Sequence, residues 1–517
     1  MPLTILTDSN VKEILDNLSK DELEGLQKAM RNSLHDYATS AESDAAQPQR
    51  TVIEAADGTT TLFMPSTNPS CIGMKGIHLF STIAEHVLTI ISVVTLPCPK
   101  SEPDTSLETP AIEVPEGEKT TPQGALTLMN SNGKPFAFVN AEEVTAFRTA
   151  LASSLLMRRR TKIKTITVFG TGKQAFWHVR LALLLRGHTI KKIHFFNRDF
   201  NQRSTNLIKS FYQFDHETKI KEGWADCKFD LTGMKYGEVD RLLKDHVRSA
   251  DMIICTTPST APLFDHKILT NSEGRKRARL IIAIGSYKPH MIEVPPEVLS
   301  QAVKIHGHSH HYQKRAEEGG VIVVDTLSCL RECGELVEAG IEAYQTVELG
   351  ELVMLSQMKA DESAIDDSPE DEESPRASLD VSSVATPTTP HSPVTPKSIA
   401  LAFRNNASFV RSSSRSNSKP ASRSASRAPS QGPSRKSSVS LSRKPSFSLK
   451  ARSLSTSSQG GKKKKKQTEQ QDQMSRWLSD GNVVYKSVGM GLMDLTVGSE
   501  LVRIARRKGV GTTVKGF

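Results

Sequence analysis

One stretch, residues 163–198, constrains the fold more than any other part of the chain. The apolar run Ile166–Phe169 stops at a glycine, as a buried parallel strand does. Gly170, Gly172 and Ala175 then form the pattern G-x-G-x-x-A. In this pattern small residues allow a tight turn, a close approach of backbone N–H groups to a pyrophosphate, and close packing of helix on strand. The anion lies at the helix N-terminus, where unpaired N–H groups favour negative charge.

The sequence around this turn completes a β-α-β unit. Apolar side chains recur at helical spacing in residues 175–186, Gly187 offers a C-terminal stop, and a second strand is expected over Lys192–Phe196. The alternative is an α/β unit with a glycine-rich turn and no nucleotide. We predict a Rossmann dinucleotide-binding domain. Its expected cofactor contacts in the turn are Gly170, Thr171, Gly172, Lys173, Gln174 and Ala175.

The end of the second strand distinguishes the two nicotinamide cofactors. NAD sites usually carry an acidic residue there for the ribose 2′-hydroxyl, whereas NADP sites carry arginine for the 2′-phosphate. This chain has Asn197 and Arg198, both expected to contact the cofactor, and then Asp199. Because a guanidinium pairs bidentately with phosphate, the sequence favours NADP(H), with NAD(H) as the alternative.

Three later apolar runs end in small or polar residues, as strands do at the ligand-binding edge of an open α/β sheet. The runs are residues 250–258, 280–286 and 321–325. We expect Thr256, Thr257 and Ser286, which end the first two runs, to contact the cofactor. Capping of the strand end is the alternative interpretation for the two threonines.

The net charge of +10 comes from one segment of the 517 residues. Residues 397–466 hold 18 lysines and arginines and no acidic residue, so subtracting 18 from +10 leaves the rest at −8. Nucleic acid is therefore not an expected partner. Residues 355–475 combine low hydrophobicity with charge blocks and with Ser-Pro and Thr-Pro pairs, a composition that cannot bury enough apolar surface to fold. We predict a disordered insertion there, with serines and threonines typical of kinase targets.

Cysteine usage and hydropathy indicate the compartment. The six cysteines form no C-x-x-C pair, no secretory leader opens the chain, and no apolar stretch approaches a membrane span. We therefore expect a cytoplasmic protein with no integral membrane contact. Cys329 and Cys333 have the spacing of a packed helical pair, which is less typical of metal ligation, and no metal site is expected. The run Lys462–Lys466 is interpreted as solvated charge, with a nuclear signal as the alternative.

These segments, in this order, resemble the ornithine cyclodeaminase/mu-crystallin family, and in particular its ketimine-reductase branch. The matching pieces are Phe63–Pro65, Gly73–Lys75, Asn140–Ala150, Val168–Ala175, Ala250–Pro258, Ala283–Ser286, Gly334–Leu336, Tyr485–Gly489 and Asp494–Leu495. The resemblance implies an α/β protein that forms a homodimer. It implies an α+β substrate and dimerisation domain over residues 1–158, a Rossmann domain over 159–350, the insertion 355–475, and a segment 476–517 that returns to the substrate domain.

The resemblance also implies the substrate anchors. Arg50, Lys75 and Arg148 lie at positions that resemble the family's carboxylate and phosphate anchors. Arg148 and Thr149 would lie near the cofactor pyrophosphate. Lys75, on an apolar strand, would have a lowered pKa and act as a proton donor, with Arg50 as the second catalytic residue. The alternative for each is a solvated surface charge.

One departure from the family bears on the reaction. Cyclodeaminases carry an aspartate two residues after the glycine of Ala-Ile-Gly, where this chain has Tyr287. A phenol, with a reference pKa of about 10, cannot replace a carboxylate base at neutral pH. His290 replaces an aspartate common in the reductase branch and is either a proton shuttle or a surface histidine. We therefore expect an NAD(P)H-dependent enzyme that reduces the C=N bond of a small cyclic imino acid. The alternatives are a cyclodeaminase that uses bound NAD and a non-catalytic NADP-binding regulatory protein.

Overall fold

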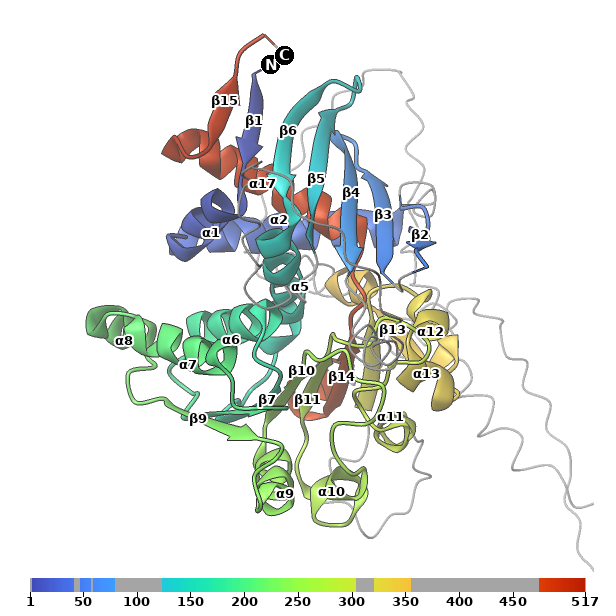
Figure 1. The fold of residues 1–517 in the computed structure, drawn as a ribbon. Coiled ribbons are helices and arrows are strands. Elements are labelled where there is room, and N and C mark those ends of the chain that lie inside the picture. The colour runs from blue at the N-terminus through green and yellow to red at the C-terminus, as the bar shows by residue number, and fades with distance from the viewer. Residues whose placement is uncertain are drawn as a thin grey trace, which may run out of the picture. The chain divides into compact units, whose positions relative to one another are not determined.

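The computed structural model describes residues 2–40, 47–56, 59–79, 123–303, 320–354 and 474–516 (Figure 1). All of these except Met474 belong to one unit, made of Met1–Ala402 and Ser475–Phe517. They form two sheets with their covering helices. No helix in the described ranges combines the length and the apolar character needed to cross a membrane.

The first sheet is mixed and has the strand order β15-β1-β6-β5-β4-β3-β2. Its strands are β1 (Leu3–Leu6), β2 (Thr51–Glu54), β3 (Thr60–Thr67), β4 (Cys71–Leu79), β5 (Gln123–Asn130), β6 (Pro135–Asn140) and β15 (Thr512–Val514). Only β1 and β6 pair in parallel. Alternate residues of β3 and β4 are buried, as expected for a sheet with one covered face.

Four helices cover that face or connect it to the second sheet. They are α1 (Asp8–Asp16), α2 (Lys20–Thr39), α5 (Ala141–Met157) and α17 (Gly491–Lys508). Thr7 and Ser19 cap α1 and α2 with reciprocal side-chain bonds, so these helices begin where the sequence places hydroxyl residues. The α17 helix packs against α2, α5, β3 and β4, which brings residues near the end of the chain onto the first sheet.

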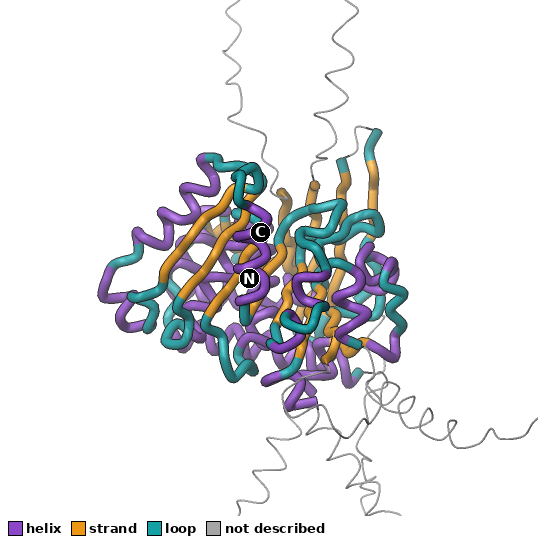
Figure 2. Tube along the Cα trace, turned by 90° about the horizontal axis from the view of Figure 1, so that it is seen from below, coloured by secondary structure: helices purple, strands orange, loops and turns teal. Residues whose placement is uncertain are grey.

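The second sheet is entirely parallel and has the order β13-β12-β14-β11-β10-β7-β8-β9. Its strands are β7 (Thr165–Phe169), β8 (Lys192–Asn197), β9 (Lys228–Gly233), β10 (Met252–Cys255), β11 (Leu280–Ala283), β12 (Gly320–Val324), β13 (Thr346–Glu348) and β14 (Asn482–Lys486). Every residue of β10 and β11 is buried, because helices cover both faces of a parallel sheet (Figure 2).

The covering helices follow the strands along the chain. They are α6 (Lys173–Arg186), α7 (Gln202–Gln213), α8 (His216–Glu222), α9 (Val239–Ser249), α10 (Lys267–Thr270), α11 (Pro296–Ala302), α12 (Cys329–Glu332) and α13 (Gly334–Glu338), with 3-10 turns η1 (Gly274–Lys276) and η2 (Ala343–Gln345). The predicted α/β class with a Rossmann sheet is confirmed.

The helices α5 and α6 join the two sheets. The rings of Phe147 and Trp177 meet edge to face, with centroids 5.2 Å apart, and the Trp177 indole N–H donates to Glu143 at 2.7 Å. His178 lies buried between the Ser153 hydroxyl and the Gln174 carbonyl. Because α5 is buried around almost its whole circumference, its apolar residues do not form the stripe of a surface helix.

The structure differs from the sequence prediction for residues 476–517. The resemblance implied that this segment returns to the substrate domain, but β14 lies inside the parallel sheet, between β11 and β12. Only α17 and β15 pack with the first sheet. Apart from its last two residues, the predicted insertion 355–475 lies outside the described residues.

Candidate functional site

The glycine turn between β7 and α6 has the backbone that its pattern requires. Gly170 has φ +100°, and a Cβ there would lie 2.7 Å from the Thr256 hydroxyl oxygen. Gly172 precedes α6, and a Cβ on it would meet open space. No side chain caps α6, so no capping residue accepts hydrogen bonds from its first backbone N–H groups. A turn of this kind can receive a pyrophosphate on backbone N–H groups.

The other predicted side chains of this turn are engaged with neighbouring elements. The Lys173 ammonium group lies 3.0 Å from carboxylates of Asp8 and Glu142 and 2.6 Å from Glu143. Burial opposes its charge, but these carboxylates raise the pKa of Lys173 above its ordinary value. The Gln174 amide reaches the Thr145 carbonyl at 3.5 Å. The turn therefore offers a ligand its backbone, because Lys173 is already held by acidic side chains.

Two further predicted contacts, Thr171 and Thr149, are buried. The Thr149 hydroxyl donates to the Thr145 carbonyl of its own helix at 2.8 Å. Its hydroxyl proton is thereby used within α5, and its contact with the cofactor stays a prediction.

At the end of β8, the residues expected to select the cofactor differ in whether their side chains have partners. Asn197 donates its side-chain amide to the Asp199 carbonyl at 2.7 Å, and the Asp199 carboxylate pairs with Lys235 at 2.6 Å. Arg198 is exposed, and none of the described residues forms an ion pair or hydrogen bond with its guanidinium. Lys235 therefore neutralises the Asp199 carboxylate, whereas the Arg198 guanidinium is available to an incoming anion.

A buried carboxylate ties together the loops that follow β10 and β11. Glu293 accepts hydrogen bonds from the backbone N–H groups of Thr257 at 2.7 Å and Gly285 at 2.6 Å, and from that of Ser286 at 3.1 Å. Burial raises the pKa of Glu293 to about 7, although the nearby Lys486 charge opposes this shift. All three partners are donors, so the geometry is that of an ionised carboxylate. Thr256, in turn, donates to the Phe169 carbonyl at 2.8 Å.

Ser286 belongs to a second buried cluster beside this one. Its hydroxyl donates to Glu335, which also pairs with the Lys486 ammonium group at 3.0 Å. Burial opposes the charge of Lys486, but Glu335 raises the pKa of this lysine above its ordinary value. Lys486 ends β14, so this network fixes the carboxyl ends of β11 and β14 relative to α13.

Asp325, directly after β12, shapes the turn that follows β14. It accepts hydrogen bonds from the Ser487 hydroxyl at 2.8 Å and from the N–H groups of Val488 at 3.0 Å and Gly489 at 2.6 Å. Gly489 has φ +90°, and a Cβ there would lie 2.2 Å from the Arg148 guanidinium. The Lys-Ser-Val-Gly turn is therefore built to let Arg148 pass close to its backbone.

Lys75 and Arg148 share one carboxylate oxygen in the interior. Asp494, in the first turn of α17, places Oδ1 2.8 Å from the Lys75 ammonium and 3.2 Å from Nε of Arg148. The side chains of Lys75 and Asp494 are fully buried. Burial, opposed in part by Asp494, lowers the pKa of Lys75 to about 8. The other carboxylate oxygen, Oδ2, is buried and has no partner in the described structure.

Arg50 lies near the same pair, ahead of β2. It forms an ion pair with Glu332 of α12, and burial lowers the pKa of its guanidinium. The charge of Arg148 acts on both Arg50 and Lys75. The structure thus brings the three predicted cations together, beside the carboxyl ends of β12 and β14. Glu332 and Asp494, which pair with them, have no assigned role in the sequence analysis.

Tyr287 leaves the parallel sheet and packs on the first one. Its ring contacts the buried cluster of Leu62, Ile77, Leu79 and Ala141, and burial raises the pKa of its phenol. Lys288 donates to Thr60 at 3.0 Å, whereas His290 is exposed. The tyrosine therefore serves packing between the two sheets.

No cluster of three or more His, Cys, Asp or Glu side chains suited to a metal ion occurs in the described ranges. Cys329 and Cys333, whose spacing suggested a helical pair, are both buried. Cys329 lies in α12 and Cys333 immediately follows it.

Comparisons with known proteins are consistent with this arrangement. No protein-family profile matches the chain. It is 27% identical over 252 residues to an uncharacterized protein of Saccharomyces cerevisiae, covering 44% of this chain and 63% of that protein. It is 28% identical over 193 residues to an uncharacterized cyclodeaminase of Dictyostelium discoideum, covering 36% and 50%. It is 26% identical over 198 residues to a Delta(1)-pyrroline-2-carboxylate reductase of Bacillus cereus, covering 37% and 52%. The matched region thus spans between half and two thirds of each of these relatives.

Solved structures of low sequence identity have a similar fold. An archaeal alanine dehydrogenase dimer with bound NAD is 14% identical, with a TM-score of 0.53 and coverage of 100% of both chains. The Delta(1)-pyrroline-2-carboxylate reductase of Thermococcus litoralis, in complex with NADH and L-proline, is 14% identical, with a TM-score of 0.52 and coverage of 99% and 100%. The relatives named cyclodeaminase and Delta(1)-pyrroline-2-carboxylate reductase, together with solved structures of the same fold, agree with the resemblance to the ornithine cyclodeaminase/mu-crystallin family.

Proposed function

We propose that the protein is an NAD(P)H-dependent reductase of the C=N bond of a small cyclic imino acid. The observation that carries this proposal is the buried Lys75, which shares Asp494 with Arg148 beside the turn after β14. A buried, protonated amine in a cationic pocket can both donate a proton and attract a carboxylate. Relatives named Delta(1)-pyrroline-2-carboxylate reductase support the substrate class.

The glycine turn fits a nicotinamide dinucleotide. A side chain at Gly170 would collide with Thr256, and the open space at Gly172 leaves backbone N–H groups accessible. When bound, the reduced cofactor supplies the hydride. We propose NADP(H) over NAD(H), because Arg198 is exposed while Asp199 is paired with Lys235. Backbone groups of the turn, with Thr256, Thr257 and Ser286 at the strand ends, would line this site.

The cationic residues divide the remaining tasks. Lys75 would protonate the imine nitrogen, since with its pKa near 8 it is mainly protonated at neutral pH and still able to lose a proton. Arg148 and Arg50 would hold the substrate carboxylate. Arg50 is paired with Glu332 in this structure, so a substrate carboxylate would have to replace that partner.

A cyclodeaminase is the second candidate, and one relative carries that name. The packing of Tyr287 argues against cyclodeaminase activity. That phenol is half-buried against apolar side chains of the first sheet, and its pKa is raised rather than lowered. A group of this kind does not accept a proton from an amine at neutral pH.

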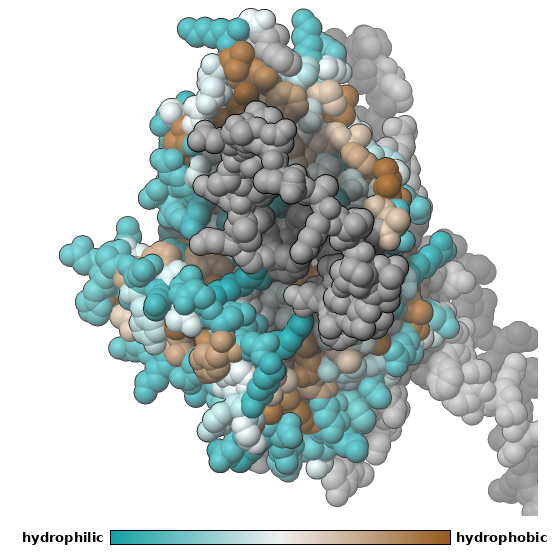
Figure 3. All heavy atoms as spheres, in the orientation of Figure 1, coloured by the Kyte–Doolittle hydropathy of each residue, from teal (hydrophilic) through white to brown (hydrophobic). Residues whose placement is uncertain are grey.

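We also propose that the protein is a cytoplasmic homodimer, joined through the outer face of the first sheet. Apolar side chains on or beside that face are partly exposed, among them Phe63 at 38% and Met74 at 39%. Figure 3 shows apolar surface over the first sheet in the upper part of the view. A structural neighbour is described as a dimer.

The first test is an assay of the full-length protein with NADPH or NADH and a panel of cyclic imino acids, followed at 340 nm. We expect oxidation of the cofactor, and a loss of about 100-fold or more in kcat for Lys75→Ala, because general acid catalysis contributes that much. Lys134→Ala, an exposed lysine in the turn between β5 and β6, is the matched control.

Three other outcomes of this assay would contradict the proposed reaction or the proposed role of Lys75. Ammonia release from ornithine without net cofactor oxidation would make the protein a cyclodeaminase. Cofactor binding with neither activity would indicate a regulatory protein. Full reductase activity in Lys75→Ala would remove this lysine from the mechanism.

A further inference from the structure

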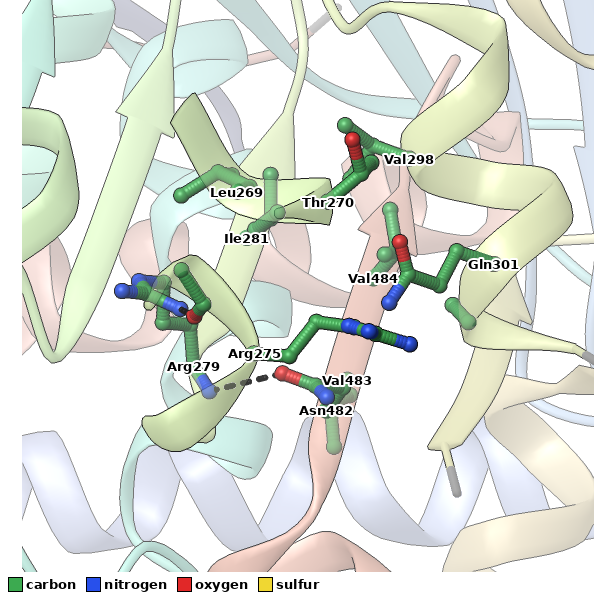
Figure 4. Close-up of a pocket in the computed structure, with 12 residues that line it drawn as sticks. Leu269, Thr270, Arg275, Arg279, Ile281, Val298, Gln301, Asn482, Val483 and Val484 are labelled. Atoms are coloured by element: carbon green, nitrogen blue, oxygen red, sulfur yellow. Dashed lines mark hydrogen bonds between the residues drawn. The ribbon is translucent and has the colours of Figure 1, made fainter. Parts of the chain in front are cut away.

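A pocket lies at the amino-terminal edge of the parallel sheet, the edge opposite to the glycine turn. It lies among α10, η1, α11 and the first residues of β14 (Figure 4). About 410 Å³ of space not filled by protein atoms lies in the pocket and at its mouth, open solvent included. Its polar lining consists of Thr270, Arg275, Arg279, Gln301 and Asn482. None of these residues belongs to the proposed reductase site.

Arg279, which directly precedes β11, is a buried cation without an acidic partner in the described structure. It is 3% exposed, and its guanidinium donates to the carbonyls of Gly274 at 2.7 Å, Arg277 at 2.6 Å and Arg248 at 2.6 Å. Its Nε has no partner. Burial and then the neighbouring Arg277 charge lower the pKa of Arg279 to about 10. Carbonyl dipoles solvate this charge but do not neutralise it, so a nearby anion would be stabilised.

Arg275 adds a second positive charge. Its side chain reaches across the pocket between Asn482 and Gln301 (Figure 4). Within the described ranges it makes no side-chain hydrogen bond or ion pair, and its Nε is buried. Two acidic side chains of the same region form ion pairs with other cations: Glu273 with Lys276 at 2.6 Å, and Asp251 with Arg277 at 2.9 Å.

The remaining polar groups are also suited to an oxygen-rich ligand. The Asn482 amide oxygen accepts from the Arg279 backbone N–H at 3.2 Å, which leaves its amide N–H groups free to donate. The Gln301 amide and the Thr270 hydroxyl have no partner among the described residues. Ile281, Val298 and Val484 provide apolar lining between these donors. The pocket therefore combines several donors and two cations with a small apolar surface.

We propose that this pocket binds a small organic anion, with a carboxylate or phosphate group held by Arg275 and the neighbouring amides and a short apolar body against Ile281 and Val484. Such a ligand would contact the first residues of β14 and the residue before β11, the two strands whose opposite ends carry Lys486 and Ser286. The site does not depend on the proposed reductase activity.

The test is a titration of the full-length protein by isothermal calorimetry, with inorganic phosphate and with valerate as separate probes. Chloride keeps the ionic strength constant, and saturating NADH keeps the glycine turn filled. We expect saturable binding of at least one probe, and Arg275→Gln to weaken it by about tenfold or more, because a charge-assisted hydrogen bond is lost.

Lys276→Gln is the matched control, since this exposed lysine lies in the same turn but pairs with Glu273. It should bind the probes as the unchanged protein does. Circular dichroism and a thermal melt establish that Arg275→Gln is folded. Binding of phosphate alone or valerate alone identifies the head group. No saturable binding, or equal binding by folded Arg275→Gln, overturns the proposal.

Discussion

At the scale of single residues, the charge balance around Asp494 stands out. One carboxylate serves Lys75 and Arg148, and the neighbouring Arg50 is matched by Glu332. These three cations are close to one another, and the Asp325 carboxylate also acts on Arg50. Because like charges repel one another in a buried site, a substrate carboxylate would stabilise the three cations. The unpartnered Oδ2 of Asp494 could in addition accept a bond from a protonated imine.

Asp494 also sets the pH range in which Lys75 can act. Its negative charge raises the pKa of Lys75, against a stronger lowering by burial that leaves the value at about 8. Reductase activity should therefore fall as the pH rises above about 8, when Lys75 loses its proton. Asp494→Asn should move this fall to lower pH. A pH profile of kcat/KM measures the fall in activity and its shift in Asp494→Asn. Circular dichroism verifies that the variant is folded. A fall at the same pH in folded Asp494→Asn would contradict the assignment.

Arg198 should decide between the two dinucleotides. Its guanidinium is exposed and unpaired among described residues, so it can meet a 2′-phosphate. Arg198→Ala should weaken NADPH binding by about tenfold or more and leave NADH binding nearly unchanged, because a charge-assisted bond to phosphate is lost. Fluorescence titrations with each cofactor measure the effect, and Lys209→Ala on α7 is the exposed control. An equal loss for both cofactors would exclude this role.

At the scale of elements, the site depends on loops that strand ends hold in place. Glu293 joins the loop after β10 to the loop after β11, while Asp325 joins the end of β12 to the turn after β14. Each acid accepts bonds from backbone N–H groups that would otherwise be buried without partners. The shape of the proposed nicotinamide side of the site is therefore controlled by residues that need not touch a ligand.

Removing the charge of Glu293 should weaken cofactor binding. Glutamine has one acceptor oxygen, and its amide N–H groups would face backbone donors. We expect Glu293→Gln to raise the Kd for the dinucleotide by about tenfold, since an unsatisfied buried donor costs about 1–3 kcal/mol. Glu297→Gln, on the exposed side of α11, is the control. An unchanged Kd in folded Glu293→Gln would show that the loops hold their shape without this carboxylate.

The sequence predicted those parts of the molecule whose cause is local. Strand β7 and its glycine turn follow from a few adjacent residues. The contacts of Asp494 with Lys75 and of Asp325 with Ser487 were not predictable, because these partners lie more than 150 residues away along the chain. The contact of Glu293 with Thr257, 36 residues away, was not predictable for the same reason. Lys173 was predicted to contact the cofactor, and its ion pair with Asp8, on a distant helix, was not predictable.

At the scale of the whole molecule, the first sheet leaves apolar side chains for a partner. Met74 lies on the strand face opposite to Lys75, so the strand that carries the proposed proton donor also contributes to the proposed dimer interface. Dimer formation and the geometry of the site are thereby linked through β4.

A charge at Met74 should separate the subunits. Met74→Glu would place a carboxylate in an apolar interface, and we expect dimerisation to weaken by about 100-fold or more. Sedimentation equilibrium measures the change. Ile220→Glu, an equally apolar but exposed position on α8, should leave the dimer intact. A monomeric unchanged protein would contradict the proposal, as would a Met74→Glu protein that stays dimeric.

The position of β14 has a consequence for how the chain folds during synthesis. This strand pairs with β11 on one side and with β12 on the other. The edges of β11 and β12 that face β14 therefore stay unpaired until residues 482–486 have left the ribosome. Until then both strands present unpaired edges, which attract other chains. The ribosome adds about 5–20 residues per second, so translating residues 325–481 prolongs this exposure by about 8–30 seconds. Production of the protein should therefore depend on chaperones that shield nascent sheet edges, and shortening that interval should raise its yield.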